Sequence, residues 1–229
     1  LIREYKPDLA VVYADRYESF SFAIASSHCN IPLLHIEAGD ITEGGTYDDY
    51  IRHCISKMSH LFCTSTKKGK AVVERLGEES WRIIQSGLLS YDDMSQISNK
   101  DRSMVMKKFG ISQNVPLILA TMHPLPKDPI KTKIESENFF DALIQISNEY
   151  DTRILITGPN SDFGSEIIQE VINERIKRIK NASFHESLGG FNYQTLMSLT
   201  KENTVIVCGN SSSIIKEAPF YNAHSLNIG

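Results

Sequence analysis

The sequence predicts an α/β fold with parallel sheets, arranged as two successive domains. Short apolar runs of strand length alternate with helical patterns along the chain, which is typical of parallel strands joined by helices. The runs are apolar almost throughout, as expected for strands that are buried on both faces. A polar stretch between Leu88 and Gln113 interrupts this series, and the alternation restarts at Val115. We therefore expect one domain at residues 1–95 and a second at residues 96–229.

The individual elements follow from these patterns in chain order. Apolar runs predict strands at residues 9–13, 31–34, 61–64, 82–85, 117–121, 153–157, 205–208 and 225–228. The patterns between them predict helices at residues 16–28, 48–58, 67–76, 100–109, 133–149, 163–179, 190–200 and 211–220. The helix at 133–149 is the clearest, because its apolar residues recur at spacings that form one stripe. In open α/β sheets, ligands bind in the loops that follow the carboxyl ends of the strands.

Length and composition are those of an ordinary globular protein. The chain has 229 residues, of which 23% are charged and 41% hydrophobic, and this length allows a substantial core. The net charge of −4 argues against nucleic acid or an acidic membrane as a partner. No apolar stretch approaches the roughly 18 residues of a membrane span. The four cysteines lack metal-type spacing, so we expect reduced thiols, a cytoplasmic protein and no zinc site.

Both ends of the chain are abrupt. It begins with Leu1 instead of Met, without a signal-peptide pattern, and stops just after an expected strand. We therefore expect a fragment that is truncated at both ends.

The most informative segment runs from His35 to His53, directly after the second expected strand. Its acidic residues are Glu37, Asp40, Glu43, Asp48 and Asp49, and its basic residues are His35, Arg52 and His53. Acids with separated pKa values let one site perform both acid and base chemistry, and carboxylates held close together acquire such values. Because this segment follows a strand at the ligand-binding edge, we interpret it as an active site.

Part of this segment has a purely structural explanation. Asp48 and Asp49 could simply open a helix, where the macrodipole favours acids. Asp48 would then pair with Arg52 on the surface, for about 0.2–0.5 kcal/mol. This alternative does not account for Glu37 and Asp40, which lie upstream of the helix. We therefore favour a catalytic role for the acidic segment.

Asp15 ends the first expected strand, and Arg16 follows it. An aspartate in this position can cap the next helix, and the two residues alone leave capping and function equally open. The neighbouring strand is expected to lead into the acidic segment, and this placement favours function.

Two further loops in the second half follow expected strands. His123, in the sequence TMHP, follows the strand at 117–121. A lone histidine is usually structural, but this one is expected at the ligand-binding edge. The sequence GPN, which ends at Asn160, is explained by loop chemistry. Only its location suggests that it forms a wall for a nucleotide base.

The sequence GNSSS at residues 209–213 follows a strand and opens a helix. Small residues at a helix N-terminus let backbone N–H groups and hydroxyls surround a phosphate, although the pattern is not a P-loop. A serine N-cap is the structural alternative, but it requires only one of Ser211, Ser212 and Ser213. Glu217, further along the chain, could hydrogen-bond a ribose diol, as an acidic residue does in dinucleotide folds.

The motifs, in chain order, are DR, HIEAGD, TEG, DDYIRH, KMSHL, SGLLSYD, MHP, GPN and GNSSSIIKEA. With these motifs, nearly the whole chain resembles the UDP-N-acetylglucosamine 2-epimerases, in particular the hydrolysing branch of the sialic-acid pathway. The resemblance implies two Rossmann-like domains of glycosyltransferase-B type and a nucleotide sugar as the substrate. It also implies that neither a metal nor a nicotinamide cofactor is used, and that the protein forms homodimers, as the family tends to do.

The implied reaction converts UDP-N-acetylglucosamine, or a related nucleotide-linked acetamido sugar, to a free N-acetylmannosamine-type sugar and a nucleoside diphosphate. It proceeds by elimination and then hydration. By resemblance, the acid/base candidates are Asp15, Glu37, Asp40, Asp48 and Asp49, with Asp15, Asp40 and Asp49 ranked first. The expected substrate-binding residues are Arg52 and His53 for the sugar, Asn160 for the base, His123, Ser211, Ser212 and Ser213 for the diphosphate, and Glu217 for the ribose.

Departures from the family pattern leave alternatives open. Ala14 stands where the family usually has glycine, and Asp40 stands where many hydrolysing members have glutamate. Glu37 matches the non-hydrolysing branch, whereas TEG and DDYIRH favour the hydrolysing one. The remaining hypotheses are a non-hydrolysing epimerase, a diacetamido sugar linked to GDP or UDP as the substrate, a non-catalytic nucleotide-sugar sensor, and a glycosyltransferase of the same architecture, which would need an acceptor site.

Overall fold

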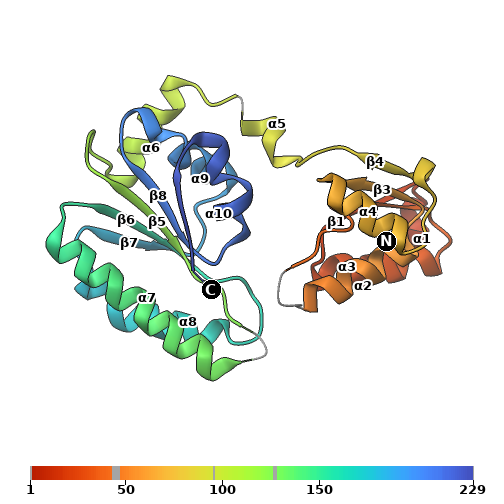
Figure 1. Ribbon diagram of the computed structural model, residues 1–229, viewed down its shortest axis with the longest axis horizontal. Helices are drawn as coiled ribbons and strands as arrows, with labels where there is room; N and C mark the ends of the chain where they lie inside the picture. Colours follow the sequence, from red (N-terminus) through yellow and green to blue (C-terminus); the bar gives the residue numbers. More distant parts are fainter. Residues whose placement is uncertain (1, 43–46, 95, 126–127, 229) are drawn as a thin grey trace. The chain divides into compact units, whose positions relative to one another are not determined.

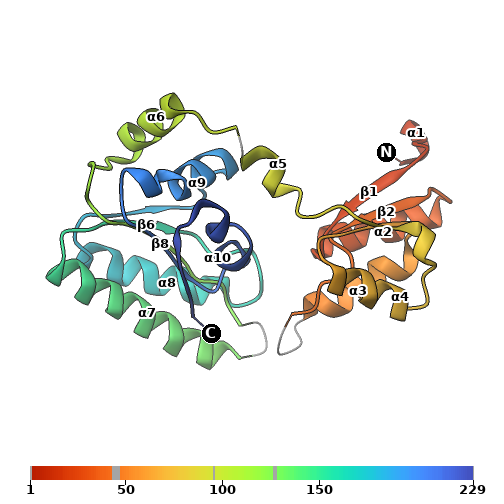
Figure 2. The same ribbon diagram turned by 45° about the horizontal axis from the view of Figure 1, so that its top comes forward.

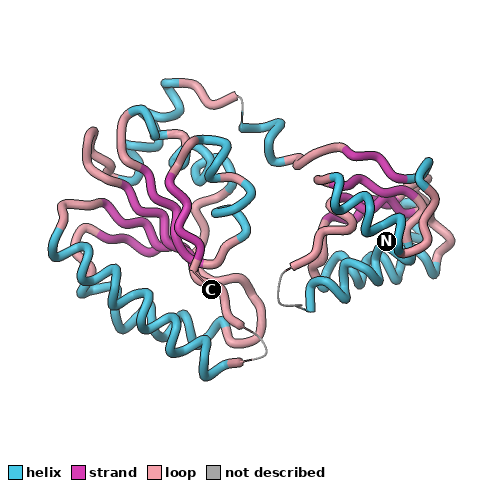
Figure 3. Tube along the Cα trace, in the orientation of Figure 1, coloured by secondary structure: helices cyan, strands magenta, loops and turns pink. Residues whose placement is uncertain are grey.

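The computed structural model describes residues 2–42, 47–94, 96–125 and 128–228. The chain divides into two compact units, Leu1–Asp92 and Asp93–Gly229. Each contains one parallel sheet packed against helices (Figure 1 and Figure 3). The predicted α/β fold class is therefore confirmed. Within the described ranges, every helix falls short of the length and apolar content that a membrane-spanning segment requires.

The described residues of the first unit form a four-stranded sheet in the order β1-β2-β3-β4, with all neighbours parallel. The elements in chain order are α1 (Ile2–Tyr5), β1 (Ala10–Tyr13), α2 (Tyr17–His28), β2 (Leu33–Ile36), α3 (Tyr47–Met58), β3 (Leu61–Thr64), α4 (Lys67–Arg75), the 3₁₀ helix η1 (Ser80–Arg82) and β4 (Ile83–Gln85). Helices α2, α3 and α4 all pack on one face of this sheet, because the buried residues Val12, His35, Phe62 and Ile83 are partners across the four strands and point to the same side.

Two small cores hold this sheet against its helices. The core formed with α2 and α3 consists of Ala10, Val12, Ala23, Leu33 and Ile55. The core beneath α4 consists of Ala38, Phe62, Val73 and Ile83. Because side chains alternate along a strand, the other two residues of β1, Val11 and Tyr13, lie on the opposite face from the first core. Both are about half exposed, at 50% and 48%.

The described residues of the second unit form a five-stranded parallel sheet in the order β7-β6-β5-β8-β9. Its strands are β5 (Leu117–Thr121), β6 (Arg153–Thr157), β7 (Ala182–His185), β8 (Val205–Gly209) and β9 (His224–Asn227). Its helices are α6 (Asn99–Phe109), α7 (Pro129–Glu149), α8 (Ser165–Arg175), η2 (Ile176–Arg178), α9 (Gly190–Met197), η3 (Leu199–Lys201), α10 (Ser212–Lys216) and η4 (Ala218–Tyr221), while α5 (Ser90–Met94) spans the boundary between the units.

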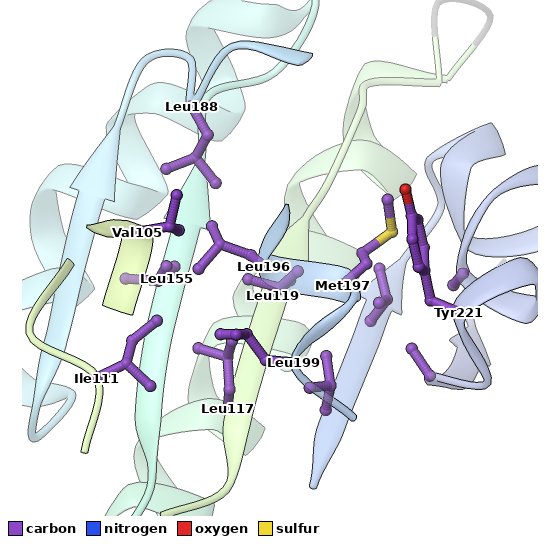
Figure 4. Packing of buried hydrophobic residues seen from close by; sticks show 14 of the residues in the cluster. Val105, Ile111, Leu117, Leu119, Leu155, Leu188, Leu196, Met197, Leu199 and Tyr221 are labelled. Carbon is purple, nitrogen blue, oxygen red and sulfur yellow. The ribbon is translucent and has the colours of Figure 1, made fainter. Parts of the chain in front are cut away.

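The second sheet is buried on both faces. Helices α7 and α8 cover one face, and α6, α9 and α10 cover the other (Figure 1 and Figure 2). Figure 4 shows the second of these layers, in which Leu119 and Leu155 of the sheet pack with Leu196 of α9 and Val105 of α6. All four side chains are fully buried, so the near-continuous apolar runs of the strands reflect burial from both sides.

The order of the second sheet reverses at β5. From β5 the chain continues to β6 and β7 on one side, and it then returns to β8 on the other side of β5. Ligands of open α/β sheets bind at the carboxyl ends of the strands where the order reverses in this way. The loops that follow β5 and β8 contain His123 and the GNSSS sequence, so both motifs lie at this position.

Three of the differences from the sequence prediction have a clear local cause. Strand β2 lies two residues later than expected and includes His35, because Pro32 has no N–H for the sheet ladder and the fully buried His35 continues the strand. Strand β7 was not predicted, since this edge strand is half-buried along its length and has no apolar run. Helix α7 begins earlier than expected, at Pro129, because Asp128 caps it and proline suits the first helical position.

Candidate active site

At the carboxyl edge of the first sheet, the guanidinium of Arg52 lies between two carboxylates. Its Nη1 donates to Asp49 Oδ1 and to the backbone carbonyl oxygen of Asp40, both at 2.6 Å. Its Nη2 donates to the carboxylate of Asp15. The Arg52 side chain is 7% exposed, and those of Asp15 and Asp49 are 18% and 12% exposed. The end of β1 and the first turns of α3 therefore form one nearly buried ion cluster.

The electrostatics of this cluster favour the charged form of Arg52. Burial alone lowers the pKa of the Arg52 guanidinium, but Asp15 and Asp49 outweigh burial and raise the pKa above its usual value. Asp49 also accepts the backbone N–H of Thr42, at 2.9 and 3.2 Å from its two oxygens. Charge-assisted bonds of this kind are the strong ones in proteins. They hold Thr42, in the loop between β2 and α3, against α3.

His35 supports this edge from inside the sheet. It is fully buried, with Nε2 2.8 Å from the Ala14 carbonyl oxygen and Nδ1 3.0 Å from Ser56 Oγ. Because a carbonyl can only accept, Nε2 carries the proton and Nδ1 accepts from the hydroxyl. Burial lowers the pKa of His35 to about 4, so the ring is neutral at pH 7. His35 thus braces β1 against α3.

Glu37 is the first residue after β2 and is 7% exposed. Its φ of +61° is a left-handed conformation that costs a non-glycine residue about 1–2 kcal/mol. The hydroxyl of Tyr13 donates to Glu37 Oε1 at 2.7 Å. Two residues later, a Cβ on Gly39 would come within 2.1 Å of the Gly69 carbonyl oxygen, so only glycine allows the loop to pass this close to α4. The backbone direction of Glu37 is therefore tightly constrained.

The remaining predicted residues of the first unit are less closely connected to the ion cluster. Asp48 lies half-buried in the first turn of α3. His53, also on α3, lines an apolar groove with Phe20 and Met58, and its buried Nδ1 has no hydrogen-bond partner among the residues that the structure describes. Binding of the sugar by His53 stays a prediction. Glu43 and most of the TEG sequence lie outside the described residues.

In the second unit, His123 is held in one orientation after β5. The Asn160 N–H donates to its Nδ1 at 3.0 Å. The side-chain amide of Asn210 accepts from the His123 N–H at 2.7 Å and donates to its carbonyl oxygen at 2.9 Å. Because Nδ1 accepts, the neutral ring carries its proton on Nε2. That nitrogen is a donor suited to an anionic oxygen.

The serine turn after β8 has a defined geometry. At Gly209, with φ +127°, a Cβ would lie 1.6 Å from the Thr121 carbonyl oxygen, so this position requires glycine. Ser211 caps α10, accepting from the Ser213 N–H at 3.4 Å, and the two serine Oγ atoms are 3.0 Å apart. The hydroxyl of Tyr193 lies 3.1 Å from Ser213 Oγ. The turn is thus anchored from β5 and from α9.

The other two predicted residues of this turn differ in exposure. Ser212 is exposed at the start of α10, and Glu217 is half-buried at its C-terminal end. Asn160 contributes its backbone N–H to His123, while its side-chain amide donates to Asp162 at 2.5 Å. The nucleotide contacts expected of Ser212, Glu217 and Asn160 stay predictions.

Sequence reasoning missed three residues that organise these edges. Asn210 lay inside the GNSSS motif, and its amide could have been recognised as a means of joining two loops. Tyr13 and Tyr193 gave no signal, because each reaches its partner through the pairing of elements that are distant in sequence. Burial raises the pKa of the Tyr193 hydroxyl, so it stays protonated and can donate to Ser213 at neutral pH.

The whole chain, residues 1–229, matches the family model described as UDP-N-acetylglucosamine 2-epimerase. The chain belongs to this family. It is 31% identical to a protein of Legionella pneumophila named UDP-N,N'-diacetylbacillosamine 2-epimerase (hydrolyzing), over 97% of this chain and 56% of that protein. It is 33% identical to the Campylobacter jejuni GDP/UDP-N,N'-diacetylbacillosamine 2-epimerase (hydrolyzing), over 99% of this chain and 57% of that protein. The chain thus spans little more than half of these relatives.

Solved structures of the 2-epimerase family share the fold. The crystal structure of the Neisseria meningitidis UDP-GlcNAc 2-epimerase bound to UDP-GlcNAc has a TM-score of 0.78 at 20% identity, covering 97% of this chain and 59% of that one. The Methanocaldococcus jannaschii enzyme in complex with UDP-GlcNAc and UDP has a TM-score of 0.72 at 20% identity, covering 92% and 57%. These similarities confirm the predicted glycosyltransferase-B type of fold.

Proposed function

We propose that the complete protein is a hydrolysing 2-epimerase of a nucleotide-linked acetamido sugar. It would release UDP and a free N-acetylmannosamine-type sugar. The observation that carries this proposal is the set of carboxylates gathered at the end of the first sheet, with Asp15 and Asp49 on Arg52 and Glu37 beside Tyr13. Removal and return of a carbon-bound proton require an acid and a base at one site.

The proposed first step is an elimination. A base removes the proton from C2 of the sugar while the C1–O bond breaks, and the electron pair of that bond leaves with the diphosphate. In the second step, water adds its oxygen to C1 of the resulting glycal, and a proton is returned to C2 on the opposite face. Both steps need proton transfer at C2, so the site must hold a carboxylate that can change its protonation state.

Glu37 is our first candidate for this transfer. A carboxylate paired with a guanidinium loses that pairing when it takes a proton, whereas one that is bonded to a neutral hydroxyl does not. Asp15 and Asp49 both accept from the guanidinium of Arg52, and Glu37 Oε1 accepts from the neutral hydroxyl of Tyr13. We assign the remaining carboxylates, Asp40 and Asp48, to proton transfer with water in the hydration step.

The second unit would hold the leaving group. His123 Nε2–H and the hydroxyls of the serine turn are donors at the reversal of sheet order, where open α/β sheets bind ligands. Donors oriented before the reaction stabilise the charge that develops on the departing diphosphate. The bonds of Asn210 and Asn160 to His123 and of Tyr193 to Ser213 provide such orientation. Glu217 and Asn160 are proposed contacts of the nucleoside.

The choice of the hydrolysing reaction rests on the names of the relatives above 30% identity. Two are named hydrolysing 2-epimerases of UDP-N,N'-diacetylbacillosamine, which favours a diacetamido sugar as the substrate. A Neisseria meningitidis relative named UDP-N-acetylglucosamine 2-epimerase is 27% identical. The non-hydrolysing reaction is the second candidate, since Glu37 follows that branch in the central motif.

The test is to incubate the complete protein in D₂O with UDP-N-acetylglucosamine and, separately, with UDP-N,N'-diacetylbacillosamine. Proton and phosphorus NMR should show UDP and a free epimerised sugar that carries deuterium at C2. Glu37→Gln should lower kcat at least about 100-fold, which is the lower range for loss of a general acid or base. The matched control is Asp8→Asn, which changes an exposed carboxylate of the same unit and should leave kcat unchanged.

Each other outcome identifies a different function. An epimerised sugar that is still attached to UDP would establish the non-hydrolysing reaction. Binding of both nucleotide sugars without turnover would support a sensor and refute the enzymatic proposal. Full activity of Glu37→Gln would remove Glu37 from the mechanism while leaving the reaction itself intact.

A further inference from the structure

Tyr13 lies directly beside the candidate proton-transfer residue. It is the last residue of β1, on the face of the strand opposite the α2–α3 core. In the parallel register Tyr13 is the partner of Ile36, and Glu37 is the first residue after this pair. This pairing brings the Tyr13 hydroxyl to 2.7 Å from Glu37 Oε1, which is the usual distance for a hydroxyl–oxygen hydrogen bond.

From this geometry we propose that Tyr13 is a positioning residue of the 2-epimerase reaction, holding the Glu37 carboxylate in the orientation in which it exchanges a proton with the substrate. The inference rests on the proposed function. It concerns a residue that does not belong to any of the recognised motifs. Tyr13 would act through Glu37 and need not touch the sugar.

Three consecutive residues at the end of β1 each bind a different element of the site. Tyr13 donates to Glu37, the Ala14 carbonyl accepts from His35, and Asp15 accepts from Arg52. Ala14 has a φ of +54°, so the chain turns sharply between the two side chains that flank it. This turn sends Tyr13 toward β2 and Asp15 toward α3. One strand end thereby fixes both the proton-transfer candidate and the ion cluster.

The exposure of the two partners supports positioning over simple packing. Tyr13 is 48% exposed and Glu37 is 7% exposed, so a hydroxyl that could be solvated by water binds a nearly buried carboxylate instead. The left-handed backbone of Glu37 directs this side chain, and a carboxylate with a fixed donor keeps one rotamer. Proton transfer depends steeply on such alignment, because displacement of a reacting group by about 1 Å can cost a factor of 100.

The test uses Tyr13→Phe in the complete protein, which removes the hydroxyl and keeps the ring. We expect kcat to fall about tenfold, the size associated with one hydrogen bond to a charged group. KM, inhibition by UDP and the melting temperature should stay unchanged. Tyr5→Phe, which removes an exposed hydroxyl from α1 in the same unit, is the matched control and should leave kcat unchanged.

A second pair of variants separates positioning from a structural role. Glu37→Asp keeps a carboxylate but withdraws it from the Tyr13 hydroxyl by one methylene. In this background, Tyr13→Phe should change kcat less than twofold, since the bond is already lost. A tenfold loss in both backgrounds, or an unchanged kcat in the single variant, would overturn the inference. If the wild-type protein releases no UDP from either nucleotide sugar, the proposed function fails first, which is a distinguishable result.

Discussion

Replacing Arg52 with leucine removes the cation that the carboxylates of Asp15 and Asp49 share, while keeping an apolar side chain in its place. Leucine can fill part of the volume beneath the guanidinium, so the main loss is electrostatic. Two carboxylates and the Asp40 carbonyl oxygen lose their donor at once. The first unit should therefore be strongly destabilised.

The size of this effect follows from burial. Removing one partner of a buried ion pair typically costs about 3–5 kcal/mol, because the other charge is left uncompensated. The side chains of Asp15 and Asp49 are 18% and 12% exposed, so water can solvate them partially when the guanidinium is gone. Asp49 also keeps the Thr42 N–H. We therefore expect a loss near the lower limit, about 3 kcal/mol.

Urea unfolding of the complete protein measures the loss in free energy of unfolding, and hydrogen exchange of peptides from α3 assigns it to the first unit. Adding Asp15→Asn and Asp49→Asn to Arg52→Leu should recover part of the stability, because no uncompensated charge is left. The control is Lys131→Leu, which breaks a surface ion pair on α7 in which Lys131 Nζ lies 3.3 Å from Glu135 Oε1. This variant should lose less than about 1 kcal/mol of stability. A loss below about 1 kcal/mol for Arg52→Leu, or no recovery in the triple variant, would refute the reasoning.

Two further predictions concern burial and backbone geometry. Since the pKa of His35 is lowered to about 4 while the unfolded chain titrates near 6.5, stability should fall by about 3 kcal/mol as the pH drops through this window. His35→Gln should flatten that slope in urea unfolding between pH 4.5 and 7, and equal slopes in both proteins would contradict the assignment. Gly209→Ala places a Cβ 1.6 Å from the Thr121 carbonyl oxygen and should cost more than about 3 kcal/mol. Gly190→Ala, where a Cβ meets nothing within 4 Å, should change the melting temperature little, and similar losses for both variants would contradict the steric explanation.

The order of strands and helices could be predicted because it depends on local patterns. The strands of the second sheet are buried on both faces and therefore appear as continuous apolar runs. Strand β7 was missed because its edge position requires no such run. The limits of β2 were misplaced because apolar character alone does not show where ladder pairing begins, and Pro32 cannot donate to that ladder.

The position of the motifs in the fold could also be predicted, but their hydrogen-bond partners could not. A parallel sheet brings the ends of its strands to one edge, so Asp15, Glu37 and His123 were expected in ligand-binding loops from topology alone. The partner of each could not be read in this way. His35 was expected among the basic residues of the predicted site, and its burial within β2 makes it a neutral brace.

The sequence by itself determined the α/β class, the alternation of strands and helices and the loops that contain the candidate site. These properties follow from which residues are apolar and how they repeat, and such information is local. Only the tertiary structure decided that Arg52 joins Asp15 to Asp49, that Tyr13 binds Glu37, and that Asn210 holds a residue 87 positions away. Each of these bonds depends on strand register and helix orientation, because a hydrogen bond forms only when donor and acceptor approach within about 3 Å in the right direction. That condition is set by the packing of the whole unit, which no local pattern contains.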